Sequence, residues 1–130
     1  MSEPFDIYED AGRPKPTDIA VRGAERQFQI TFEDGRDFTF SHEFLRVESP
    51  SAEVMGHGPS QRQWVPGKIN VAITEIEEVG NYAVRLTFDD GHNTGIYSFS
   101  YLYDIGDRYE EIWERYCNEL DNLGLSRAAP

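Results

Sequence analysis

The hexapeptide ITFEDG at residues 30–35 returns as LTFDDG at residues 86–91, and each is typical of a strand that ends in a tight turn. Before the first turn, Phe28, Ile30 and Phe32 alternate with polar residues, the pattern of a strand with one buried face. Asp-Gly between two such strands predicts a hairpin, because glycine accepts the positive φ that the turn requires. The sequence therefore predicts at least two antiparallel β-hairpins.

The segments that follow the two turns also resemble each other. FSHEFLR at residues 40–46 aligns with YSFSYLY at residues 97–103 after one inserted residue. This repetition has two explanations, an internal duplication or convergence on one efficient hairpin, and both stay open at this stage.

The C-terminal part of the chain is predicted to be helical. Apolar residues recur at spacings of three and four from Ile105 to Leu123 and form one face. Asp107 and Glu110 resemble a capping box, and Gly124 fits the position after the helix. The predicted fold is α+β, with antiparallel β-hairpins forming small sheets and one C-terminal amphipathic helix.

The length of 130 residues fits one domain. Residues 1–17 contain three prolines and little periodicity, so we expect a flexible N-terminal tail there. We expect the domain itself at residues 18–124 and a C-terminal tail at residues 125–130.

Charge and composition exclude several classes of protein. The chain carries 24 acidic against 12 basic residues, a net charge of −12, which argues against a nucleic-acid or anionic-membrane partner. Cys117 is the one cysteine, so no intrachain disulfide or cysteine-based metal cluster can form. No apolar run is long enough for a membrane span, and the acidic N-terminus is unlike a secretory signal. We expect a cytoplasmic protein.

One stretch of the chain is free of acidic residues. Val54 to Thr74 contains neither Asp nor Glu in 21 residues. Glycine and proline predict a loop over its first part, and the alternation from Ile69 to Ile73 predicts a strand. The loop is a structural turn, an anion-binding site or a contact for a partner, and we expect its cations to lie at the surface. Candidate binding residues in and near it are His57, Arg62, Trp64, Lys68 and His92.

The residues give no catalytic constellation. The three histidines lie in no H-x-D, H-x-E or H-E-x-x-H motif, and His42 and Glu43 would point to opposite faces of a strand. None of the serines lies in a G-x-S-x-G elbow. We therefore expect no enzymatic activity.

Three longer segments carry a family resemblance. LRVESPSAEVMGHGP at 45–59, GKINVAI at 67–73 and IEEVGNYAVRLTFDDGHNTGIYSFSYLYDIG at 76–106 together resemble the DUF971 family, also called the gamma-butyrobetaine hydroxylase-like N-terminal domain, in its stand-alone bacterial form. The resemblance covers roughly residues 17–118 and implies a small α+β domain. Such domains are also found ahead of 2-oxoglutarate-dependent carnitine-biosynthesis dioxygenases and fused to Mrp-type iron–sulfur carrier ATPases.

The resemblance also implies where a zinc ion would bind. In the dioxygenase members three cysteines and one histidine hold zinc, and these positions fall on Ser49, Ser51, Val54 and His92. Hydroxyl groups are poor zinc ligands and valine is none, so we expect the zinc site to be lost, and we expect no cofactor.

Two functions of different classes follow. The first is a non-catalytic accessory domain that binds another protein, linked through the family's fusions to iron–sulfur or iron-dependent enzymes. The alternative is a small anionic-ligand binder or enzyme that uses the loop at residues 55–68 together with His92.

Overall fold

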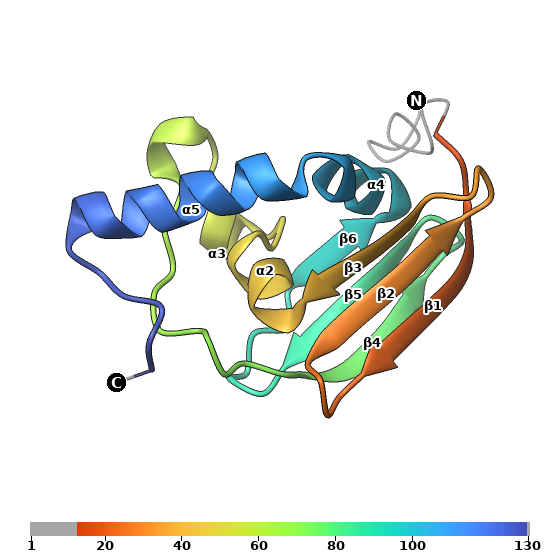
Figure 1. Cartoon of the computed structure of the whole chain (residues 1–130), viewed down its shortest axis with the longest axis horizontal. Coiled ribbons are helices and arrows are strands. Elements are labelled where there is room, and N and C mark those ends of the chain that lie inside the picture. The colour runs from red at the N-terminus through yellow and green to blue at the C-terminus, as the bar shows by residue number, and fades with distance from the viewer. Residues whose placement is uncertain (1–12, 130) are drawn as a thin grey trace.

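The computed structural model describes residues 13–129 and contains two three-stranded sheets with helices packed against them (Figure 1). The first sheet has the strands β1 (Pro16–Arg22), β2 (Gln27–Phe32) and β3 (Asp37–Ser41), and the second has β4 (Ile73–Val79), β5 (Ala83–Phe88) and β6 (Gly95–Ser98). The helices are α2 (His42–Val47), α3 (Ala52–Met55), a 3₁₀ turn (Pro59–Gln61), α4 (Phe99–Asp107) and α5 (Tyr109–Leu123). The predicted α+β fold class, with antiparallel hairpins in small sheets and a C-terminal helix, is confirmed.

The repeated sequence folds into a repeated structure. Both sheets have the strands in chain order, all neighbours are antiparallel, and the register of each first strand shifts near its start. Both third strands lead into a helix whose first turn is capped by serine. Ser41 accepts a hydrogen bond from the amide of Phe44 at 2.9 Å, and Ser98 accepts one from the amide of Tyr101 at 3.0 Å. The two halves of the chain thus follow one plan.

The two Asp-Gly turns are built alike. The amide of Phe32 donates to the carbonyl of Arg36 at 2.8 Å, and the amide of Phe88 donates to the carbonyl of His92 at 2.9 Å. The glycine of each turn has a positive φ, 89° in the first turn and 92° in the second. Both predicted hairpins are confirmed.

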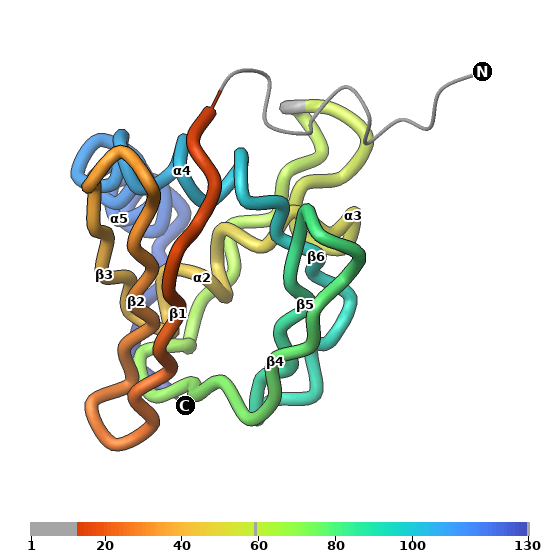
Figure 2. The backbone as a smooth tube through the Cα atoms, turned by 90° about the vertical axis from the view of Figure 1, so that its right-hand side faces the viewer, coloured from red at the N-terminus to blue at the C-terminus, as the bar shows by residue number. Residues whose placement is uncertain are grey.

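The core lies between the two sheets, which face each other in Figure 2. Side chains that alternate along β2 and β5 are buried against one another; they are Phe28, Ile30, Phe32, Val84, Leu86 and Phe88. Helix α5 closes the open side, where the ring of Tyr109 stacks on Phe44 at 4.2 Å between centroids. A smaller cluster beneath α5 joins Val47 to Tyr116 and Leu120.

His42 connects the two halves through a fully buried imidazole. Its Nδ1 accepts a hydrogen bond from the amide of Ile73 at 3.0 Å, and its Nε2 lies 3.1 Å from the carbonyl of Gln27. Because an amide can only donate, Nδ1 must be unprotonated and Nε2 must carry the proton that is donated to Gln27. Burial lowers the pKa of His42, which keeps the ring neutral.

The C-terminal helical region contains two helices, α4 and α5, where the sequence predicted one. Ser98 starts α4 upstream of the predicted helix, and Arg108 interrupts the helical path at φ −110° and ψ 24°. The predicted capping box does not form, because Asp107 is still within α4 and no side chain caps α5. Gly124 follows α5 in the left-handed conformation, as predicted.

The ordered domain extends beyond the predicted limits at both ends. Strand β1 begins at Pro16, within the predicted N-terminal tail, while residues 1–12 of that tail lie outside the described residues. In the predicted C-terminal tail, the carbonyl of Arg127 accepts a hydrogen bond from Ile69 at 3.1 Å, and its guanidinium lies 2.7 Å from Glu43. Tertiary contacts therefore order segments whose composition predicts tails.

One local prediction is wrong because of a long-range contact. The strand predicted from Ile69 to Ile73 begins only at Ile73, because the amide of Ile69 is bonded to the C-terminal segment. His42 and Glu43 lie on no strand; they open helix α2 behind the Ser41 cap, and both are buried.

Replacing the turn glycines should destabilise the fold through backbone strain alone. An added Cβ at Gly35 or Gly91 would meet no heavy atom within 4 Å, so only the positive φ opposes a side chain. We expect Gly35→Val and Gly91→Val each to lower the free energy of unfolding by about 1–2 kcal/mol, measured by urea denaturation. Gly23→Val is the matched control, because Gly23 lies in open space with no positive φ. Unchanged midpoints for the first two variants would contradict the turn assignment.

The neutral His42 makes stability depend on pH. Its folded pKa lies below the ordinary 6.5, so the unfolded chain takes up a proton that the folded chain does not. Stability is therefore fully present above pH 6.5 and falls as the pH drops toward the folded pKa. Between pH 7.5 and 5.5 we expect this group to cost up to about 1.4 kcal/mol of unfolding free energy. His42→Gln should remove this part of the pH dependence; an unchanged pH profile in this variant would contradict the assignment.

Candidate functional site

His92 is the centre of a buried polar cluster. It follows the second Asp-Gly turn, where Asp90 accepts a hydrogen bond from its amide at 3.0 Å. Its Nε2 lies 2.9 Å from the hydroxyl of Ser49 and 3.5 Å from that of Ser51, and its Nδ1 lies 3.2 Å from the carboxylate of Glu53. Burial is the main cause of the lowered pKa of His92, and the nearby Arg46 lowers it further.

The hydroxyl, imidazole and carboxylate of this cluster are ordered as in a Ser-His-Glu relay, but the serine is not accessible. Ser49 is fully buried and its hydroxyl also accepts from the amide of Ser51 at 3.3 Å. A Cβ placed on Gly95 would lie 2.5 Å from the same oxygen, so only glycine leaves room for it. The hydroxyl of Ser49 is therefore closed to an acyl substrate in this conformation.

The four positions at which the family resemblance implies zinc ligands come from two distant segments of this chain. Ser49 and Ser51 contact His92, and Val54 is buried on the short helix α3. These groups do not fit zinc: two are neutral hydroxyls, one is a valine, and the imidazole is already bonded on both nitrogens. Over residues 13–129, no three His, Cys, Asp or Glu side chains gather in a way that could hold a metal ion.

Arg62 occupies a buried position, contrary to the expectation of a surface cation. Its side chain is 8% exposed and forms an ion pair at 2.7 Å with Glu48, which is 4% exposed. The guanidinium also lies 4.1 Å from the ring centroid of Trp64. Burial raises the pKa of Glu48 although Arg62 opposes this effect. Arg62 thus neutralises a buried carboxylate inside the protein.

Lys68 also has an internal partner. Its ammonium lies 2.6 Å from Asp90, whose carboxylate accepts a second charged hydrogen bond from Arg46 at 2.8 Å. Burial alone would raise the pKa of Asp90, but the hydrogen bonds from Lys68, the His92 amide and Arg46 lower it to about 2. Asp90 therefore holds Lys68 close to the His92 cluster and neutralises the charge of Lys68.

The two remaining candidates do not join this cluster. His57 is exposed on the loop, and no hydrogen bond or ion pair within residues 13–129 links its imidazole to Arg62, Lys68 or His92. Trp64 is half-buried and packs against the cluster beneath α5. The five predicted binding residues therefore form no single site.

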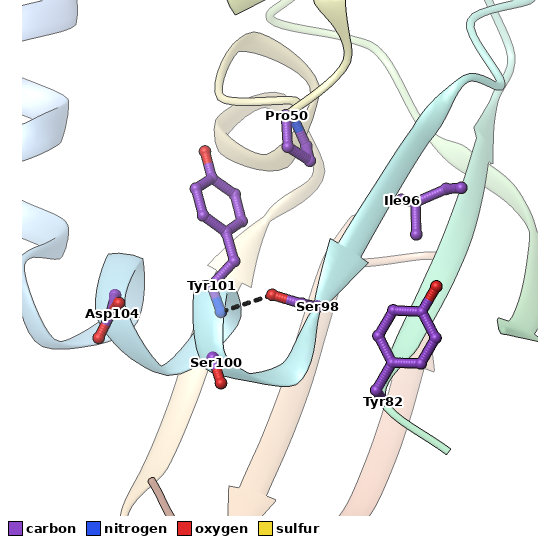
Figure 3. Close-up of a pocket in the computed structure, with 7 residues that line it drawn as sticks. All are labelled: Pro50, Tyr82, Ile96, Ser98, Ser100, Tyr101 and Asp104. Atoms are coloured by element: carbon purple, nitrogen blue, oxygen red, sulfur yellow. Dashed lines mark hydrogen bonds between the residues drawn. The ribbon is translucent and has the colours of Figure 1, made fainter. Parts of the chain in front are cut away.

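A groove lies beside β6 and α4, and none of the five predicted binding residues lines it. It has a volume of about 460 Å³, and Figure 3 shows its lining residues, Pro50, Tyr82, Ile96, Ser98, Ser100, Tyr101 and Asp104. Ile96 is 45% exposed, whereas its neighbours Gly95 and Tyr97 are buried. The sequence held one signal of this surface, an isoleucine on the outward face of a strand.

A family model for gamma-butyrobetaine hydroxylase-like, N-terminal domains matches residues 19–103. The chain belongs to this family. No curated protein matches it.

Solved structures agree with this membership of the DUF971 family. Two NMR solution structures are 44% and 37% identical to this DUF971 domain, with TM-scores of 0.78 and 0.77. The first match covers 99% of this chain and 92% of the other, and the second covers 90% and 92%. A crystal structure of a DUF971 protein of unknown function from Acidithiobacillus ferrooxidans is 37% identical, with a TM-score of 0.60 over 71% of this chain and 92% of that one.

The helices of this DUF971 domain give no candidate for a membrane span. None of those in the described part of the chain combines the length and the apolar character needed to cross a bilayer.

The buried ion pair predicts a large effect for a substitution at Arg62. Arg62→Ala leaves the carboxylate of Glu48 buried without its cation, so we expect a loss of about 3–5 kcal/mol of unfolding free energy in urea denaturation. Arg85→Ala, which breaks an exposed pair with Glu77, should cost no more than about 1 kcal/mol. Combining Arg62→Ala with Glu48→Gln should restore part of the loss. Equal costs for the two single variants would contradict the assignment.

Proposed function

We propose that this chain is a non-catalytic accessory domain that binds another protein. One contrast supports the proposal: the loop cations are neutralised by internal carboxylates, whereas the groove beside Ile96 leaves apolar surface open to solvent. Concave, partly apolar surface is typical of contact sites for other molecules.

The alternative, a binder of a small anion at residues 55–68 with His92, has weaker support. An anion would have to compete with Glu48 for Arg62 and with Asp90 for Lys68. Both carboxylates are covalently part of the protein and already desolvated, so a dissolved anion is at a disadvantage. The same contacts weigh against an enzyme that uses these residues.

Further parts of the proposal rest on the family and on charge. We propose that the partner belongs to iron–sulfur or iron-dependent enzyme chemistry, by analogy with the fusions of related domains. The net charge of −12 favours a basic protein surface over nucleic acid or an anionic membrane. We also propose that the domain works in the cytoplasm and folds without zinc, since serine and valine stand at the thiolate positions.

Binding of a purified partner tests the proposed function. The immobilised domain would capture proteins from native lysate, mass spectrometry would identify them, and calorimetry with the purified protein would measure direct binding. We expect one-to-one binding in the micromolar range. Ile96→Glu should weaken it at least tenfold, because the substitution puts a second negative charge beside Asp104 in the groove.

Lys68→Ala is the matched control at the loop. It should leave the affinity within twofold, because Arg46 still holds Asp90. A domain for which no purified protein shows direct binding would contradict the proposed function. Saturable binding of an anion, lost in Lys68→Ala, would favour the alternative.

A further inference from the structure

Strand β6 has an edge with unpaired backbone groups. It is the last strand of its sheet, and the amide of Phe99 donates to the carbonyl of Tyr82 at 2.8 Å just beyond the paired residues. Antiparallel hydrogen-bonded pairs alternate, so Tyr97 pairs with Val84 through hydrogen bonds and the N–H and C=O of Ile96 point away from β5. No hydrogen bond to a described residue occupies these two groups.

The apolar groove lies next to this edge. Pro50 and Tyr101 lie across from β6 in Figure 3, and Ile96 and Tyr82 lie on the side of the sheet. The hydroxyl of Tyr101 donates to the carbonyl of Glu48 at 2.6 Å, which fixes the ring in place. One wall of the groove is thus a strand edge, and the other is a fixed apolar surface.

In the other half of the molecule, a longer helix packs against the corresponding edge strand. Helix α4 packs against β3, where the ring of Phe38 rests on Gly106 and meets Tyr103 edge-on at 5.6 Å. Helix α2 contacts β6 in the corresponding way, through the bond from the Tyr97 hydroxyl to the Leu45 carbonyl. However, α2 has six residues and α4 has nine. The helix beside β6 therefore ends three residues sooner than the helix beside β3. The groove lies where the shorter helix has ended.

We propose that this groove binds an extended segment of a partner protein, which adds to β6 as a fourth strand and carries alternating apolar and basic residues. The inference rests on the proposed function and names its binding mode. Ile96 offers one donor and one acceptor to an incoming strand, which is how strand addition gains affinity. Apolar side chains of the segment, on alternate positions, enter the groove.

The acidic residues around the groove favour basic side chains at the polar positions of the bound segment. The groove lining includes Asp104 and no Lys or Arg, and Glu53 is bonded to Thr94 at the start of β6. A basic side chain at either end of the added strand meets a carboxylate. A second copy of this chain brings another net charge of −12 to the edge and is repelled.

Two substitutions at Ile96 separate the backbone from the side chain. Ile96→Pro removes the outward N–H without removing a bond to β5, and edge strands accept proline at such positions. Ile96→Thr keeps the N–H and removes the apolar side chain, copying Thr39 at the equivalent position of β3. Thr39→Pro is the matched control, because it makes the same backbone change on the other sheet.

The probes are two fluorescent nine-residue peptides, VKVKVKVKV and VEVEVEVEV. We expect the lysine peptide to bind the wild-type protein in fluorescence anisotropy, and the glutamate peptide to bind at least tenfold more weakly. Both Ile96 variants should lose at least tenfold in affinity for the lysine peptide, while Thr39→Pro should lose less than twofold. Amide exchange by NMR should slow at least tenfold at Ile96 when the lysine peptide is bound, which attraction by charge alone cannot produce.

Equal binding of the lysine peptide to the wild type and Ile96→Pro would overturn the proposal. So would a concentration-dependent dimer that Ile96→Pro abolishes, because the occupant would then be a second copy. A purified partner that binds Ile96→Pro as tightly as the wild type would overturn the groove assignment and leave the proposed function intact. The proposed function fails separately, when no purified protein binds the wild type.

Discussion

A buried imidazole ring needs a partner for each nitrogen, and His42 meets this need by joining the two halves of the chain. Its Nε2 donates to Gln27 in the first sheet and its Nδ1 accepts from Ile73 at the start of the second. Leaving either group unpaired in the interior costs more than the bond itself contributes. This pair of bonds holds the first residue of α2 against the first sheet and places the start of β4 beside it.

The second constraint is that the same three-stranded unit occurs twice, followed by helices of unequal length. Each helix packs toward the edge strand of the opposite sheet, α4 against β3 and α2 against β6. The shorter α2 releases the chain at Glu48, so that Glu48 meets Arg62 and Ser49 meets His92. The departure from symmetry thus creates both the buried polar cluster and the groove. In a perfect repeat a nine-residue helix would pack against β6 as α4 packs against β3.

Some charged side chains of this protein form ion pairs with one another inside the fold, and the others lie at the surface. Five charged groups near the acid-free loop form three ion pairs: Glu48 binds Arg62, and Asp90 binds both Arg46 and Lys68. Such pairs hold the loop against the sheets, and they leave few free cations there for a ligand. The remaining acids give the surface its negative sign, which suits a basic partner better than an anionic one.

The sequence by itself determined the features that depend on a few neighbouring residues. Alternation along Phe28–Phe32 gave the buried face, the Asp-Gly pairs gave both turns, and Gly124 marked the end of the last helix, because side-chain period and positive φ are local properties. The tertiary structure alone decided that Ile105–Leu123 is broken at Arg108, that Arg62 is buried, and that Ile96 borders a groove. The burial of Arg62 and the groove at Ile96 depend on partners far away in the chain, Glu48 and Pro50, and neither spacing nor composition specifies which distant groups will meet.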